Sequence, residues 1–262
     1  MNLLFIGDVV GQSGCDFLES RMYKLKREYD IDVTVVNGEN SAQGNGITPQ
    51  SYRQLLNMGA DVVTTGNHSF RRREAEEIYD TNEQLLRPAN YPEGVMGHGV
   101  TYIDMCPYKI AVVNLMGTMY MEAVENPFNY VDKLLESIDT PNIIVDFHAE
   151  ATSEKKAMGF YLQKRCTAVL GTHTHVQTAD EKIYEGMAYI TDAGFCGAEE
   201  SVIGMEFSTS FKRLSTSLPE RYEIAETPVA QINGVEILID EFKATQIKRI
   251  NLIVDNSKNE SE

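Results

Sequence analysis

The chain has 262 residues, of which 42% are hydrophobic, and it carries 39 acidic against 23 basic residues, a formal net charge of −16. A chain of this length and composition can bury a substantial core, and we predict a single α/β domain over residues 1–262. The acidic excess argues against a broad grip on duplex nucleic acid, which needs clustered Lys and Arg, but a small or locally held anionic substrate is compatible with it.

The N-terminal residues, Met-Asn-Leu-Leu-Phe-Ile-Gly-Asp, contain no basic region and no long apolar run. We therefore expect neither a secretory signal nor a membrane span, and hence a cytoplasmic protein without a membrane partner. The four cysteines lie far apart and form no Cys-x-x-Cys pair, which predicts reduced, buried thiols without a chemical role. They are Cys15, Cys106, Cys166 and Cys196.

Short β-branched runs alternate with helical patterns along the chain, which is typical of an α/β fold. We predict strands at these short runs. In chain order, the predicted strands are Leu3 to Ile6, Val33 to Val36, Val62 to Thr65, Ile110 to Asn114, Ile143 to Phe147, Ala168 to Leu170 and Ala188 to Thr191.

Three helices are predicted between these strands. The first has Phe17, Leu18, Met22, Leu25 and Tyr29 on one face, and the second starts at a Thr48-Pro49 cap and stops at Gly59. The third begins near Thr152, with Glu154 in its first turn and Lys164-Arg165 in its last.

Near the C-terminus, the pair Asn233-Gly234 lies between two short apolar runs, residues 229–232 and 235–238. Such a pair is a strong signal for a two-residue turn, so we predict a β-hairpin here, at an edge of the same domain. The polar residues 256–262 are expected to fray.

Polar side chains follow five of the predicted strands, at the point where each strand ends. Because the carboxyl ends of strands in α/β sheets line the binding crevice, these side chains can converge in space although they are far apart in sequence. The convergent set that we predict is Asp8, Glu39, Asn67, His148, His173 and His175, with His68 beside Asn67.

Carboxylate oxygen, imidazole nitrogen and amide oxygen are ligands that suit Fe, Mn or Zn, and of these metals we expect iron. If His173 and His175 continued their strand, their spacing would put both rings on one face, so two adjacent metals could each take one ring. Glu39 could then bridge the two ions with its two oxygens. The remaining histidine outside these loops, His98, is expected to have a structural role.

Six segments that extend over most of the chain share a pattern with known proteins. They are Phe5-Ile-Gly-Asp-Val-Val-Gly11, Asn37-Gly-Glu-Asn-Ser-Ala42, Thr65-Gly-Asn-His68, Arg87-Pro-Ala-Asn-Tyr-Pro92, Asp146-Phe-His-Ala-Glu150 with Thr152-Ser-Glu-Lys155, and Gly171-Thr-His-Thr-His-Val-Gln-Thr-Ala-Asp180. By these segments, which occur in family order, the chain resembles the metallophosphoesterases and, within them, the YmdB-type family of bacterial cyclic-nucleotide phosphodiesterases.

The resemblance implies a four-layer α/β/β/α sandwich of the calcineurin-like type and a site for two metal ions. The broader superfamily has a histidine two residues after its first aspartate, which this chain lacks, and the YmdB-type pattern fills that place with the residue matching Asn40. By resemblance, the first metal is bound by Asp8, Glu39, Asn40 and His175, and the second by Glu39, Asn67, His148 and His173.

The resemblance also implies hydrolysis of 2′,3′- or 3′,5′-cyclic nucleotides, with His68 placed to protonate the leaving oxygen as a general acid. A phosphomonoesterase or nucleotidase that uses the same metals is the alternative among enzymes. A third possibility is a regulatory binding protein, because the family is associated with RNA turnover and biofilm behaviour. Partners of that kind would be an RNA-decay protein or further copies of the chain.

Three segments depart from the family pattern. They are Ser69-Phe70-Arg71, Gly117-Thr118 and Gly194-Phe195-Cys196-Gly197. None of them contains a predicted ligand, so we expect any effect of these departures at the rim of the substrate pocket.

Overall fold

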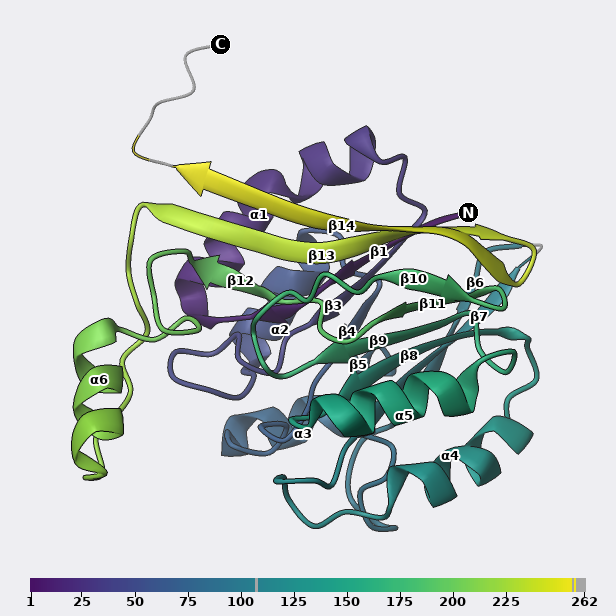
Figure 1. Cartoon of the computed structure of the whole chain (residues 1–262), viewed down its shortest axis with the longest axis horizontal. Helices are drawn as coiled ribbons and strands as arrows, with labels where there is room; N and C mark the ends of the chain where they lie inside the picture. Colours follow the sequence, from purple (N-terminus) through teal and green to yellow (C-terminus); the bar gives the residue numbers. More distant parts are fainter. Residues whose placement is uncertain (107, 256, 258–262) are drawn as a thin grey trace.

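Two β-sheets face each other at the centre of the molecule, and helices cover their outer surfaces (Figure 1). This is a computed structural model, and it describes residues 1–106, 108–255 and 257. One sheet has eight strands in the order β2-β12-β13-β1-β3-β4-β5, with β14 also paired to β13, and the other has six in the order β10-β11-β9-β8-β7-β6. The α/β fold and the four-layer arrangement are therefore confirmed.

The strands have the following bounds: β1 (Asn2–Ile6), β2 (Asp8–Val9), β3 (Val33–Asn37), β4 (Val62–Thr64), β5 (Leu85–Leu86), β6 (Val100–Asp104), β7 (Lys109–Met116), β8 (Asn142–His148), β9 (Ala168–Thr172), β10 (Lys182–Tyr184), β11 (Met187–Ile190), β12 (Phe195–Ala198), β13 (Val229–Asp240) and β14 (Lys243–Asp255). The helices are α1 (Gly11–Glu28), α2 (Pro49–Asn57), the short 3₁₀ helix η1 (Arg73–Ala75), α3 (Glu76–Thr81), α4 (Pro127–Glu136), α5 (Thr152–Leu162) and α6 (Phe207–Thr216).

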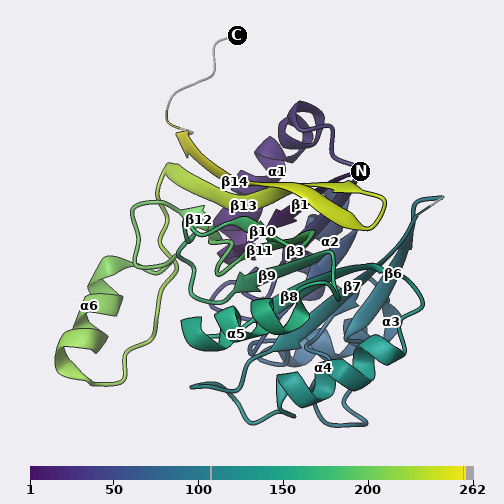
Figure 2. The ribbon, with the colours of Figure 1, turned by 45° about the vertical axis from the view of Figure 1, so that its right-hand side comes forward.

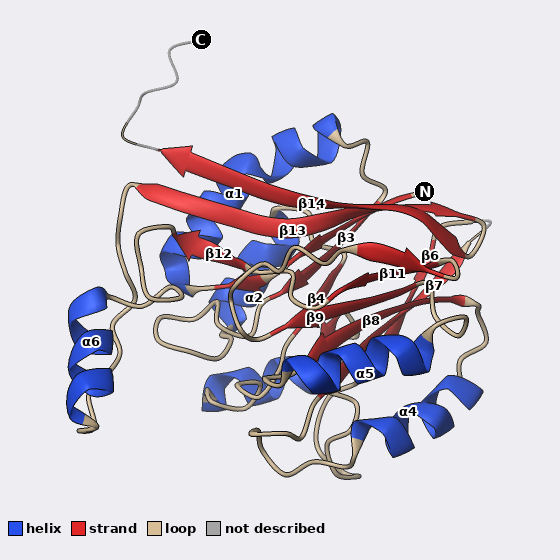
Figure 3. Ribbon diagram, in the orientation of Figure 1, coloured by secondary structure: helices blue, strands red, loops and turns tan. Residues whose placement is uncertain are grey.

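Three apolar clusters hold the four layers together. One lies between the eight-stranded sheet and the helices α1 and α2, and another lies between the six-stranded sheet and the helices α4 and α5. The third fills the space between the two sheets, where Phe5 and Val35 of one sheet join Val112 and Leu170 of the other. Figure 2 shows the same layers turned by 45°, and Figure 3 shows them coloured by element type.

The central strands of both sheets are parallel and buried on both faces, which explains why they are continuous apolar runs in the sequence. Strands β1, β3, β4 and β5 are parallel neighbours in one sheet, and β7, β8, β9 and β11 are parallel neighbours in the other. All seven predicted strands are present, with bounds that differ by one or two residues. The predicted polar residues follow β1, β3, β4, β8 and β9, so they gather at one edge of the two sheets.

The predicted hairpin at Asn233-Gly234 is wrong. Both residues lie inside the continuous strand β13, which pairs with β14 along its length, and the turn falls at residues 241–242. Gly234 is needed for close approach, because a Cβ there would lie 2.3 Å from the carbonyl oxygen of Phe5. The side chain of Asn233 bonds to Asn251 and to the backbone N–H of Phe195 instead of shaping a turn.

Smaller details of the sequence prediction also need correction. Helix α5 ends at Leu162, so Lys164-Arg165 lie beyond it, and Lys164 has a left-handed backbone. The placement of Glu154 in the first turn of α5 is confirmed; this residue is buried and accepts hydrogen bonds from the backbone of Thr118 and Met119. Cys106 is exposed, whereas the other three cysteines are buried.

The polar tail from residue 256 lies outside the described residues, apart from Ser257, so its expected fraying is not tested. None of the helices in the described part of the chain is long and apolar enough to cross a membrane.

Candidate metal centre

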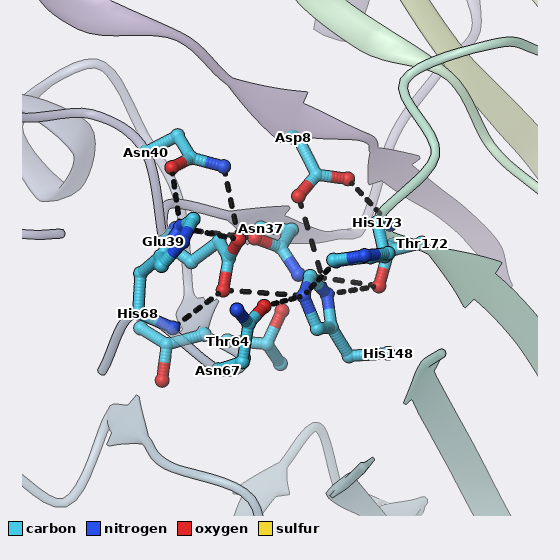
Figure 4. A network of polar contacts seen from close by, with 12 residues as sticks. Asp8, Asn37, Glu39, Asn40, Thr64, Asn67, His68, His148, Thr172 and His173 are labelled. Atoms are coloured by element: carbon cyan, nitrogen blue, oxygen red, sulfur yellow. Dashed lines mark hydrogen bonds and ion pairs between the residues drawn. The ribbon is translucent and has the colours of Figure 1, made fainter. Parts of the chain in front are cut away.

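The structure brings all the predicted site residues together where the carboxyl ends of the two sets of parallel strands meet. All of them except His175 are labelled in Figure 4, and His175 Nε2 lies 3.3 Å from Asn40 Nδ2. Asp8 is the first residue of β2, separated from the end of β1 by one residue, Glu39 lies just beyond β3, and Asn67 and His68 lie in the turn after β4. His148 is the last residue of β8, and His173 comes directly after β9. His98 is exposed and takes no part in this cluster.

Glu39 is the common partner at the centre of the cluster, and its two carboxylate oxygens face different neighbours. Its Oε1 accepts a hydrogen bond from Asn40 Nδ2 at 2.9 Å and lies 3.2 Å from His68 Nδ1. Its Oε2 lies 3.2 Å from His148 Nε2 and accepts the backbone N–H of His68. Glu39 can therefore serve two groups of ligands at once.

Each of the three candidate ligand histidines is held by one ring nitrogen, which turns the other nitrogen towards the centre. His148 Nδ1 lies 2.9 Å from Thr172 Oγ1, and that hydroxyl donates to Asp146. His175 Nδ1 donates to the carbonyl of Ile203 at 2.9 Å. Outer hydrogen bonds of this kind are what metal-binding histidines use to fix their orientation.

His173 is oriented in the same way by a carboxylate. Its Nε2 lies 2.9 Å from Glu150 Oε2, and its Nδ1 lies 3.0 Å from His148 Nε2. His148 Nε2 is also 3.1 Å from Asn67 Oδ1. Four potential ligand atoms thus converge on one point, and three of them, from Glu39, His148 and His173, lie within 4.8 Å of one another.

The two histidines of the Thr172 to His175 segment do not continue strand β9, so the predicted strand spacing does not apply to them. Both have left-handed backbones, with φ of 100° at His173 and 60° at His175. This conformation is strained for residues other than glycine, and it persists where the surrounding structure holds it in place. The residue between them, Thr174, supplies the hold by bonding through its N–H and Oγ1 to Asp192.

Asp192 is itself held by a buried ion pair. Its Oδ2 lies 2.6 Å from Lys155 Nζ on α5, and both side chains are almost completely buried. The other oxygen of Asp192 accepts the backbone N–H of Gly194. One carboxylate therefore ties the histidine-bearing loop to helix α5 and to the segment leading into β12.

Several features of the cluster fit a bound cation. Asp8 Oδ1 is fully buried and has no hydrogen-bond partner among the described residues, and its other oxygen accepts the backbone N–H of His173. Asp8 Oδ1 lies 3.6 Å from His175 Nε2, so a cation between them would satisfy both. A Cβ at Gly66 would lie only 2.3 Å from His148 Nε2 and 2.4 Å from Glu39 Oε2, so glycine keeps this space open.

The asparagines differ in which atom they present. Asn67 points its oxygen at the cluster, as a metal ligand must. Asn40 points its nitrogen at Glu39 and His175, and its oxygen lies 2.9 Å from His68 Nδ1. Exchange of the amide oxygen and nitrogen by a flip of Asn40 would turn it into an oxygen ligand beside Asp8 and His175.

The buried charges of the cluster shift one another's pKa values. Burial raises the pKa of Glu39, but the charges on His148 and His68 outweigh it and hold that pKa well below its usual range. Burial disfavours a charged His148, yet Glu39 and Asp8 raise its pKa to about 9. Burial and the charge on His148 together lower the pKa of His173 to about 4. The two buried carboxylates thus stay ionised and favour positive charge between them.

Sequence reasoning missed the residues that hold these ligands. Asp146 accepts hydrogen bonds from Asn37, Thr64 and Thr172, and burial raises its pKa to about 6. Asp192 follows the strand predicted at Ala188 to Thr191. The search for polar residues at strand ends that selected the candidate ligands would therefore have found it as well. The partner Lys155 carried no such signal, because a lysine within a helix is normally exposed.

Comparison with known proteins agrees with this geometry. A family model described as YmdB-like protein matches residues 4–250. The chain is 45% identical over 255 residues to the 2′,3′-cyclic-nucleotide 2′-phosphodiesterase of Bacillus subtilis (strain 168), with 95% of this chain and 96% of that protein covered.

Two solved structures superpose on this chain. A hypothetical protein from Thermus thermophilus superposes with a TM-score of 0.92 at 35% identity, covering 97% of this chain and 100% of the other. The calcineurin-like phosphoesterase YfkN from Bacillus subtilis superposes with a TM-score of 0.52 at 11% identity, covering 99% of this chain and 91% of the other. This distant likeness shows that the fold is of the calcineurin-like type.

The ion pair behind the histidine loop can be tested with Asp192→Asn. We expect the free energy of unfolding to fall by about 3–5 kcal/mol, because buried Lys155 loses its counter-charge, and we expect weaker metal retention because Thr174 loses its anchor. Urea unfolding and elemental analysis after dialysis measure the two effects. Asp139→Asn is the control, because it breaks an exposed pair with Lys109 and should change little. Equal effects of the two substitutions would contradict the assignment.

Proposed function

We propose that this chain, which belongs to the YmdB-like protein family, is a metal-dependent phosphodiesterase that hydrolyses small cyclic nucleotides. The observation that carries the proposal is the buried cluster around Glu39, in which carboxylate, imidazole and amide groups converge beside an open cleft. The name of the Bacillus subtilis relative favours 2′,3′-cyclic nucleotides as substrates, with 3′,5′-cyclic nucleotides as the second candidate.

We further propose a site for two metal ions that share Glu39. Asp8, Asn40 and His175 lie on one side of Glu39, and Asn67, His148 and His173 lie on the other. When bound, the ions would lower the pKa of a water molecule so that it can attack phosphorus, and would neutralise charge on the phosphoryl oxygens. The ligand set suits iron, with manganese or zinc as alternatives.

His68 is our candidate for the general acid. It lines the cleft, and its backbone N–H is fixed by Glu39 while its ring Nδ1 stays within 2.9 Å of Asn40 Oδ1. Among the described residues, nothing bonds to its Nε2, so that nitrogen is free to hold a proton for the substrate. Donation of this proton to the departing ribose oxygen would complete the cleavage.

The two-metal site predicts a specific loss of metal. Anaerobically purified protein should contain about two ions per chain, and His175→Ala should leave about one, because only one side of Glu39 loses a ligand. Elemental analysis measures both values. His98→Ala removes an exposed histidine outside the cluster and should change nothing. A single ion per chain that persists in His175→Ala would rule out the second site.

The acid role of His68 predicts that the loss of rate depends on the leaving group. His68→Ala should retain its metal, and its kcat on a cyclic nucleotide should fall by about 10²- to 10⁴-fold. On bis(p-nitrophenyl) phosphate the loss should be much smaller, because nitrophenolate departs without a proton. Steady-state kinetics on both substrates gives the comparison. If the variant instead lost its metal, His68 would be a ligand.

The substrate class is tested with a panel on metal-loaded protein. We expect 2′,3′-cyclic AMP and 3′,5′-cyclic AMP to be hydrolysed faster than 3′-AMP and 5′-AMP, with Asp8→Asn as the inactive control. The panel also tests the rival phosphomonoesterase, which shares the metals but would prefer the monoesters. A strong preference for monoesters would overturn the proposal.

Further expectations concern cellular roles and rest on the family resemblance alone. They include a link to RNA turnover or biofilm behaviour, an RNA-decay protein as partner, and assembly of several copies of the chain. An intact phenotype of Asp8→Asn in cells would favour a role in binding over a role in catalysis.

A further inference from the structure

The cleft beside the metal centre is larger than a mononucleotide requires. Its volume is about 1460 Å³, and it runs from Glu39, His68 and His173 to helix α6. Pockets for small ligands are typically about 300–1,000 Å³. A cyclic nucleotide bound at the metal centre would therefore leave the part of the cleft next to α6 empty.

That part of the cleft is walled by residues 206–223, here called the arm, which contain α6 and project beyond the two sheets (Figure 2). The arm is anchored at its base, where the chain entering it pairs with the chain leaving it. Glu206 donates its N–H to the carbonyl of Glu223, and Ala225 donates to Gly204. The arm therefore has a fixed attachment close to the metal centre and a free outer end.

Arginines line the cleft on both sides, although the chain as a whole is strongly acidic. On the side of the candidate metal centre, Arg72 bonds to the backbone carbonyls of Gln43 and Asn45, and it has no carboxylate partner among the described residues. On the arm, Arg213 and Arg221 form no ion pair with any described residue. Arg71 completes the set and pairs with exposed Glu122.

Two further features of the arm suit a nucleotide chain. The guanidinium of Arg213 lies over the ring of Tyr222 at 4.7 Å, and that residue is 40% exposed, so the pair forms a flat, cationic platform of the kind on which bases stack. The second feature is Ser210, which lines the cleft and is only 2% exposed. Its Oγ has no hydrogen-bond partner among the described residues, so this hydroxyl is available to a polar group of a bound molecule.

Acidic residues limit what the cleft can bind. Glu206, Glu223 and Glu226 also line it and pair with none of the arginines. The cleft therefore has no uniform positive field, and a phosphate can be bound only at the individual arginines. This arrangement suits a short strand with a few phosphates better than a long or double-stranded nucleic acid.

We propose that the cleft binds the 3′ end of a short single-stranded RNA that carries a 2′,3′-cyclic phosphate. The cyclic phosphate would lie at the metal centre, and the upstream phosphates would lie against Arg213 and Arg221, with a base on Tyr222. This rests on the proposed function, because a 2′,3′-cyclic nucleotide and such an RNA end present the same reactive group. The water oxygen bonds to phosphorus, the bond to one ribose oxygen breaks, and that oxygen takes a proton, which leaves a terminal phosphomonoester.

The experiment compares 2′,3′-cyclic AMP with an adenosine trinucleotide that ends in a 2′,3′-cyclic phosphate. We expect kcat/KM of the metal-loaded protein to be about tenfold or more higher for the trinucleotide, because stacking and phosphate contacts are added. In the double variant Arg213→Gln/Arg221→Gln, this ratio should fall towards one through a higher KM for the trinucleotide. Lys212→Gln is the control, because Lys212 lies on the same helix, pairs with Glu220 and does not line the cleft.

Ionic strength supplies an independent measurement. Added salt should lower kcat/KM for the trinucleotide more steeply than for the mononucleotide, and the double variant should lose most of this difference. If the mononucleotide is hydrolysed but the ratio is near one, or if the ratio is unchanged in the double variant, the inference is wrong and the proposed function stands. If neither substrate is hydrolysed, the proposed function itself has failed.

Discussion

The structure depends on the burial of two carboxylates, Asp8 and Glu39, at the edge where the two sheets meet. Neither is paired with lysine or arginine in the described structure, and an ionised carboxylate that is buried without compensation costs several kcal/mol, on the order of the net stability of a whole domain. Histidines supply part of the compensation, and a cation held among them, as we propose, would supply the rest. This requirement explains why the candidate ligand histidines converge, and why Asp8 Oδ1 faces His175 and His148 but has no hydrogen-bond partner among the described residues.

The compensation works only if the histidines cannot turn away, and the surrounding residues provide that restraint. Thr172 and Asp146 hold His148, Ile203 holds His175, and Glu150 holds His173. The strained backbone at His173 and His175 is held in turn by the buried Asp192. Lys155, which is also buried, pairs with Asp192, and Asp192 holds Thr174 between the two histidines. Lys155 thus affects the site through this loop. The stability of the fold and the geometry of the site share this interaction.

The central strands and much of the candidate site were predictable from the sequence, because parallel strands bury both faces and expose only their ends. Apolar runs marked the strands, and a polar residue after each run marked the site, so Asp8, Glu39 and His148 could be found without coordinates. The hairpin at Asn233-Gly234 could not be judged in the same way. A glycine at this position could serve a tight turn or a close approach of two strands. Only the carbonyl of Phe5 on the neighbouring strand shows that Gly234 serves the close approach. The left-handed backbone of His173 and the burial of Lys155 likewise depend on residues distant in sequence.

The arm bears on which substrate the cleft binds, whereas the residues around Glu39 bear on the reaction. A net charge of −16 argues against binding nucleic acid only if the charges are spread evenly, and in this fold they are not. On both walls of one cleft lie arginines that have no carboxylate partner among the described residues. Those of the arm lie outside the core, and the backbone pairing of residues 204–206 with 223–225 fixes where the arm is attached. Because the sheets set the position of the metal centre and this short pairing sets that of the arm, the reaction and the length of the bound strand can be changed independently. The metal ligands would determine which bond is cleaved, and the arm would determine how much of the molecule beyond that bond is bound.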